Sequence, residues 1–65
     1  QALRELKKAY ELYKDPEIAA HIVEVLWEIE EIEEAKNFLL ETTESFPNSN
    51  YLNKLSNKLF NIEES

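Results

Sequence analysis

The sequence predicts an all-α fold, and three observations support that prediction. The 65-residue chain has no glycine and only two prolines, a composition that suits helices joined by tight turns. Its apolar residues recur at spacings of three and four, the period of one helix face. The apolar pattern also returns after a shift of 33 residues, and two helices per period of that length are typical of a helical solenoid. We expect four helices, near 2–14, 17–29, 33–45 and 50–62.

Charge and composition exclude several classes of function. The 14 acidic and 7 basic side chains give a net charge of −7, which argues against nucleic acid or an anionic membrane as a partner, because both require a basic face. The absence of cysteine excludes a disulfide framework and a thiolate zinc site. No apolar run approaches the roughly 20 residues of a membrane span. Because the chain starts at Gln1, we expect it to be processed or part of a longer protein.

The first two helices are separated by a clear signal. Ala2, Leu6, Ala9 and Tyr13 form one stripe of the first helix. The dipeptide Asp15-Pro16 follows, in which aspartate is a favourable N-cap and proline is favourable in the first helical turn. A second helix therefore begins near Pro16. The segment 46–50 is the clearest loop, and Ser49 or Asn50 is expected to cap the fourth helix.

The sequence does not decide whether the second and third helices are separate or continuous. No glycine or proline lies between Glu17 and Phe46, so propensity alone allows one rod of about thirty residues. The internal repeat favours a turn near Glu30 and Glu31 instead, because each repeat must fold back to cover its neighbour. The fused rod, formed through domain swapping, remains the alternative.

The apolar frame resembles the tetratricopeptide repeat (TPR), a 34-residue helix-turn-helix unit. The residues that carry the resemblance are Ala19, Ile22, Val23, Leu26, Ala35, Leu39 and Pro47. The segment 15–27 is particularly similar to bacterial TPR proteins, including envelope-associated ones of proteobacteria, which leaves the compartment open between cytoplasm and cell envelope. The resemblance implies the second helix of a preceding repeat over 1–14, one full repeat over 16–47 and a C-terminal capping helix over 50–62.

Three positions depart from the family pattern. TPR units usually have glycine where this chain has Val23 and Glu30. Val23 is expected to push the helices slightly apart. Glu30 occupies a turn position that favours positive φ, which costs roughly 1 kcal/mol relative to glycine. Thr42 stands where alanine is common.

The resemblance implies a binding function, because TPR proteins hold proteins or peptides in a concave groove. Carried over by position, the groove residues are Glu17, Ala20, Glu24, Trp27 and Glu28. These residues are acidic with one aromatic, so a partner with a basic or apolar face is the better electrostatic match. Trp27 is either a contact residue of the groove or a frame residue that packs over the next helix, a role also open to Phe60 one period later.

A second hypothesis is self-association without a separate ligand. Leu3, Tyr10 and Tyr13 lie on the first helix, one face of which has no partner within the chain. Contiguous apolar surface of this kind is usually covered. We expect these residues to contact either upstream repeats or a second copy of the chain.

An enzyme is the least favoured class. The sequence contains no nucleophile–base pair or glycine-rich loop. His21, Glu24 and Glu28 have spacings that could share a ligand, but a bundle metal site needs several such pairs from different helices. The glutamate-rich segment 28–34 lacks the turn glycine of a calcium loop. We therefore expect no catalytic residues, no metal and no cofactor.

Overall fold

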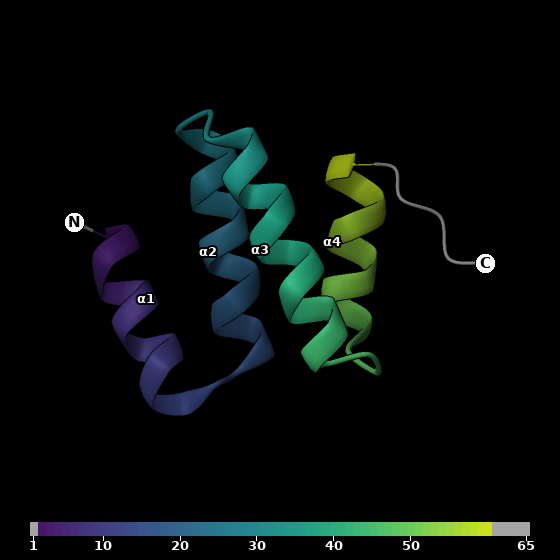
Figure 1. Ribbon diagram of the computed structural model, residues 1–65, viewed down its shortest axis with the longest axis horizontal. Coiled ribbons are helices and arrows are strands. Elements are labelled where there is room, and N and C mark those ends of the chain that lie inside the picture. The colour runs from purple at the N-terminus through teal and green to yellow at the C-terminus, as the bar shows by residue number, and fades with distance from the viewer. Residues whose placement is uncertain (1, 61–65) are drawn as a thin grey trace.

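The structure confirms the all-α prediction. A computed structural model describes residues 2–60 and contains four helices: α1 (Ala2–Tyr13), α2 (Pro16–Glu28), α3 (Ile32–Ser45) and α4 (Asn50–Phe60) (Figure 1). The starts of all four helices and the ends of the first three agree with the expected ranges to within one residue. Ile62, which we assigned to the fourth helix, lies outside the described residues.

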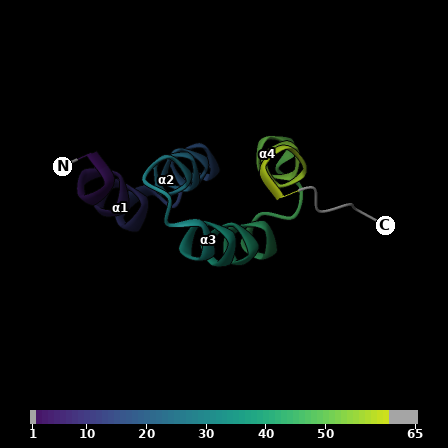
Figure 2. The ribbon, with the colours of Figure 1, turned by 90° about the horizontal axis from the view of Figure 1, so that it is seen from above.

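The helices are arranged around α2. Consecutive helices run in opposite directions (Figure 1), and α2 packs against each of the other three, while α3 also packs against α4. Seen from above, α2 and α4 lie on the same side of α3 (Figure 2). Helices α2 and α4 are therefore neighbours although a whole helix separates them in the sequence.

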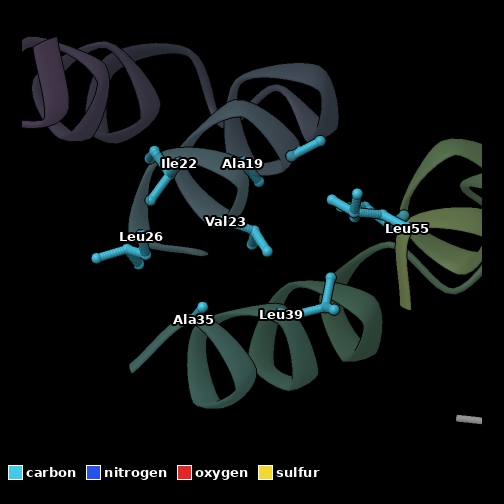
Figure 3. Packing of buried hydrophobic residues seen from close by; sticks show 9 residues of the cluster. Ala19, Ile22, Val23, Leu26, Ala35, Leu39 and Leu55 are labelled. Atoms are coloured by element: carbon cyan, nitrogen blue, oxygen red, sulfur yellow. The ribbon is translucent and has the colours of Figure 1, made fainter. Parts of the chain in front are cut away.

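The hydrophobic core lies where α2, α3 and α4 meet (Figure 3). Its nine members are Ala19, Ala20, Ile22, Val23, Leu26, Ala35, Leu39, Leu52 and Leu55. Five of them come from α2, and α1 contributes no fully buried residue. Burying a leucine, isoleucine or valine side chain stabilises a fold by about 1.5–3 kcal/mol, so most of the stability lies in the last three helices.

Val23 occupies the centre of this core. Its side chain is fully buried and points from α2 toward α3, where Ala35 and Leu39 lie (Figure 3). The alanine at position 35 leaves room for a branched side chain on the facing helix. The core therefore accommodates valine where the family pattern has glycine.

The connection between α1 and α2 confirms the predicted cap. The Asp15 carboxylate accepts a hydrogen bond from the backbone N–H of Glu17 at 2.9 Å, and Pro16 opens the helix. The preceding residue, Lys14, has a positive φ of 51°. Its N–H donates to the Tyr10 carbonyl at 2.8 Å, and its ammonium group lies 5.0 Å from the centre of the Tyr10 ring. This left-handed position, unlike the one at Glu30, was not expected from the sequence.

The connection between α2 and α3 is a turn, so the fused rod is not the conformation of this structure. Glu30 has a φ of 67°, as expected for its position. The N–H of Glu30 donates to the Trp27 carbonyl at 3.1 Å, and the N–H of Glu31 donates to the Leu26 carbonyl at 2.9 Å. These two bonds form the Schellman motif that ends many helices, normally with glycine at the left-handed position. A glutamate there costs about 1–2 kcal/mol.

The connection between α3 and α4 contains a side-chain cap at the start of α4. The Ser49 hydroxyl accepts a hydrogen bond from the Leu52 N–H at 3.3 Å. Of the two expected caps, Ser49 is therefore the one that is used.

Thr42 is buried near the end of α3, and its hydroxyl lies 3.0 Å from the carbonyl oxygens of both Phe38 and Leu39. A threonine is therefore tolerated there because its polar group is satisfied within its own helix.

Candidate functional site

The main candidate site is a groove between α2 and α4, with a volume of about 320 Å³. It is lined by Glu24, Trp27 and Glu28 from α2 and by Leu55, Lys58 and Leu59 from α4. In each helix the three residues have the spacing i, i+3, i+4, which places them on one helix face. Each wall of the groove thus combines apolar and charged side chains.

Trp27 connects the two walls. Its ring meets the Phe60 ring edge to face, with ring centroids 5.2 Å apart and an angle of 87° between the planes. Trp27 is partly buried and also lines the groove. The expectation that Trp27 packs over another helix is therefore confirmed, and its role as a contact residue for a partner stays a prediction.

The groove contains more acidic than basic side chains. Glu24 and Glu28 are one turn apart on α2, and Lys58 lies on the opposite wall. Among residues 2–60 the one ion pair is elsewhere, between the Lys7 ammonium group and the Glu34 carboxylate at 3.2 Å. The two glutamates of the groove are therefore not neutralised by an ion pair with a described basic side chain.

Two of the five predicted groove residues do not line this groove. Ala20 is fully buried in the core, so the expectation that it forms part of a binding surface is wrong. Ala20 is buried because it lies on a helix, α2, that packs against α1, α3 and α4. Glu17 is exposed in the first turn of α2, but it is not among the residues around the groove.

The wall contributed by α4 was not expected from the sequence. A shift of 33 residues pairs Leu55 with Ile22 and Leu59 with Leu26, so the repeat indicated that these positions of α4 are apolar but not that they line a groove. The repeat did not indicate a charged residue at Lys58, because the residue one period earlier is Val25. Only the packing of α4 beside α2 identifies it.

The three self-association candidates do not form one exposed surface. Leu3 and Tyr10 pack partly against the core, and Tyr10 meets Phe38 edge to face with ring centroids 5.5 Å apart. Burial raises the pKa of the Tyr10 phenol above its ordinary value of 10.0, and the Glu41 carboxylate raises it further. Tyr13 is 71% exposed, and its neighbour Leu12, which we had not singled out, is 76% exposed.

A second hollow lies along α1. It has a volume of about 360 Å³ and is lined by Leu3, Arg4, Lys7, Lys8 and Glu11. The ammonium group of Lys7 is already engaged by Glu34. This hollow is lined by side chains of a single helix, whereas the α2–α4 groove has two walls.

Residues 2–60 show no cluster of metal ligands and no helix suited to span a membrane. No group of three or more histidine, aspartate or glutamate side chains within residues 2–60 is placed to hold a metal ion. His21 is exposed on α2. None of the four helices is both long enough and apolar enough to cross a membrane.

Comparison with known proteins adds no relative. Scans against models of protein families, curated proteins and solved structures found no match to this chain. The fold is all-helical over the described residues, and the α2–α4 groove is the candidate site whose walls come from two helices.

Proposed function

We propose that the chain is a protein-interaction module, the end of a TPR-type helical solenoid, and that it holds a segment of a partner protein in the α2–α4 groove. One observation carries the proposal. Two helices that are equivalent under the 33-residue repeat form the two walls of a single groove, and each presents apolar and charged side chains to it.

The packing supports the repeat assignment. Ile22 and Leu55 are equivalent under the shift of 33 residues, and both are buried in the core. Trp27 and Phe60 are also equivalent, and their rings are in contact. We assign 1–14 to the second helix of a preceding repeat, 16–47 to one full repeat, and 50–62 to a capping helix. In this proposal the chain is a binding module and has no catalytic role.

The groove favours a ligand with basic and apolar side chains. Glu24 and Glu28 offer two carboxylates against the single ammonium group of Lys58. A lysine or arginine of the ligand could pair with these carboxylates while its aliphatic stem covers the face of Trp27, an arrangement that also permits a cation–π contact. Leu55 and Leu59 offer apolar contact on the other wall. A segment that alternates basic and apolar side chains fits both walls.

Trp27 is the only tryptophan of the chain, so its fluorescence reports on the groove directly. The probes are two short peptides of equal length, one combining leucine with lysine and the other combining leucine with glutamate. We expect the lysine peptide to bind more tightly and to shift the Trp27 emission. The double variant Glu24→Gln/Glu28→Gln should lose that preference, whereas Glu33→Gln/Glu44→Gln, which changes two exposed glutamates outside the groove, should keep it. Equal binding of both peptides would refute the assigned ligand chemistry.

Self-association through α1 is the second candidate function, and the exposure of Leu12 and Tyr13 favours it. A Trp27→Ala variant separates the two candidates when binding is followed through a label on the peptide. Groove binding predicts weaker peptide capture with an unchanged oligomeric state. Self-association through α1 predicts that Tyr13→Ala, and not Trp27→Ala, lowers the mass of the particle in solution.

A further inference from the structure

We propose that the turn at Ile29–Glu31 can open into continuous helix, so that two copies of this chain exchange their α3–α4 halves and form a dimer. The proposal does not depend on ligand binding in the groove. It rests on the backbone of the turn, on two exposed isoleucines beside it, and on the absence of helix-breaking residues in the sequence around it.

The turn is held against the local preference of its residues. Glu30 adopts a φ of 67° although it carries a Cβ atom. Glu31, at the N-cap of α3, makes no side-chain capping hydrogen bond. No glycine or proline lies between Glu17 and Phe46. A continuous helix would remove the positive φ and pair the backbone groups of the turn within the helix.

Two exposed isoleucines fit the open conformation better than the closed one. Ile29 is 54% exposed and Ile32 is 39% exposed, on either side of the turn. In one helix over 16–45, these isoleucines would lie on one stripe with Val25 and Lys36, neither of which is fully buried in the closed chain. The steps of three and four along this stripe are those of a coiled-coil seam, with a single polar position.

Exchange places this stripe near a two-fold axis. The opened turn is the crossing point of the two chains, so Ile29 of one copy comes opposite Ile32 of the other, and the reverse. The contacts of the closed chain are kept, because α2 of one copy packs against α3 and α4 of the second copy. The isoleucines left exposed in the closed chain are thereby covered by an identical partner.

The exchanged dimer would contain two complete grooves. Each would take the wall with Trp27 from one copy and the wall with Lys58 from the other. Two grooves in one particle allow two linked ligand segments to bind with a higher effective concentration than a single groove offers. Exchange would thus convert a monovalent module into a bivalent one.

The charge of the turn opposes exchange. Five glutamates, at positions 28, 30, 31, 33 and 34, surround the opening point, and the dimer brings two such sets together. Salt screens repulsion between exposed charges. The dimer population should therefore rise with ionic strength.

The decisive comparison is Glu30→Ala against Glu30→Gly. Both variants remove the same carboxylate, but alanine favours the continuous helix and glycine favours the left-handed turn. After refolding from urea at high protein concentration, sedimentation should show a dimer dissociation constant at least about tenfold lower for Glu30→Ala than for Glu30→Gly. The proposal would be overturned if both variants stayed monomeric from micromolar to millimolar concentration, or if their dimer dissociation constants were equal.

A crosslinking experiment distinguishes exchange from association of surfaces. The chain has no cysteine, so Glu24→Cys and Lys58→Cys can be introduced on separate copies of the Glu30→Ala chain. These positions face one another across the groove, and a short thiol crosslinker should join the two copies after they are refolded together. As a comparison, Ile29→Ser should weaken the dimer, whereas Leu40→Ser, at a 43% exposed position of α3 off the stripe, should not. A dimer without this crosslink would also overturn the proposal.

Discussion

Trp27 and Phe60 are one repeat period apart in the sequence and meet edge to face, with ring centroids 5.2 Å apart. This contact joins α2 to the end of α4 beside the groove. The same tryptophan therefore contributes to the packing of α4 and to the lining of the α2–α4 groove. Stability and binding should be coupled at this position.

Replacing Phe60 by leucine tests the structural part of that coupling. Leucine keeps much of the apolar area but removes the aromatic pair, so the free energy of unfolding should fall by about 0.5–1.5 kcal/mol. Urea unfolding followed by Trp27 fluorescence measures the loss, and the native emission should shift to the red as the indole gains water contact. Tyr51→Leu, at an exposed position of the same helix, should change stability by less than about 0.5 kcal/mol. Equal losses would contradict the assigned role of the pair.

Leu39 and Leu40 form a matched pair for testing the core. Leu39 is fully buried, whereas Leu40 is 43% exposed. Leu39→Ala should cost about 2–5 kcal/mol, a large share of the roughly 3–10 kcal/mol expected for a domain of this size. Leu40→Ala should cost less than about 1 kcal/mol. Circular dichroism during urea unfolding compares the two variants, and similar midpoints would show that the core is wrongly placed.

Asp15 tests the start of α2. The Asp15→Ala variant removes the side-chain acceptor of the Glu17 N–H and should lower the free energy of unfolding by about 1 kcal/mol. Asp15→Asn keeps an acceptor oxygen at the same place and should recover most of that loss. Thermal unfolding of the three proteins measures both effects. If the asparagine variant were as unstable as the alanine variant, the capping bond would not be the cause.

The raised pKa of Tyr10 predicts that the stability of the fold decreases at alkaline pH. Burial, aided by the Glu41 carboxylate, raises the pKa of its phenol in the folded chain above the ordinary value of 10.0. Below pH 10 the phenol is protonated in both the folded and the unfolded chain and contributes no pH dependence. Above pH 10 the unfolded chain loses the proton first, so stability falls as the pH rises through the folded pKa.

The phenol of Tyr10 can be isolated from other alkaline effects by comparison of variants. Tyr10→Phe should lose less stability above pH 10 than the unaltered chain, as measured by urea unfolding at a series of pH values. Tyr13→Phe, at a 71% exposed position, should follow the unaltered chain. Identical pH profiles for all three proteins would exclude Tyr10 as the source.

Much of the fold could be predicted because short-range signals set it. The spacing of Ala2, Leu6 and Ala9 is sufficient to predict a helix, and Asp15 and Ser49 begin the helices that they were expected to begin. The site was less predictable. Glu24, Trp27 and Glu28 were identified on α2, but the burial of Ala20 and the position of Lys58 depend on which helices pack around α2.

The sequence alone determined that this protein is helical, where two of its three connections fall, and that it is acidic with an apolar frame repeated after 33 residues. The tertiary structure decided the turn at Glu30 and the pairing of α2 with α4. Local propensity favours continuous helix through the turn. Folding back becomes favourable because it buries Val23, Ala35 and Leu39 together, and that gain exceeds the cost of a left-handed glutamate.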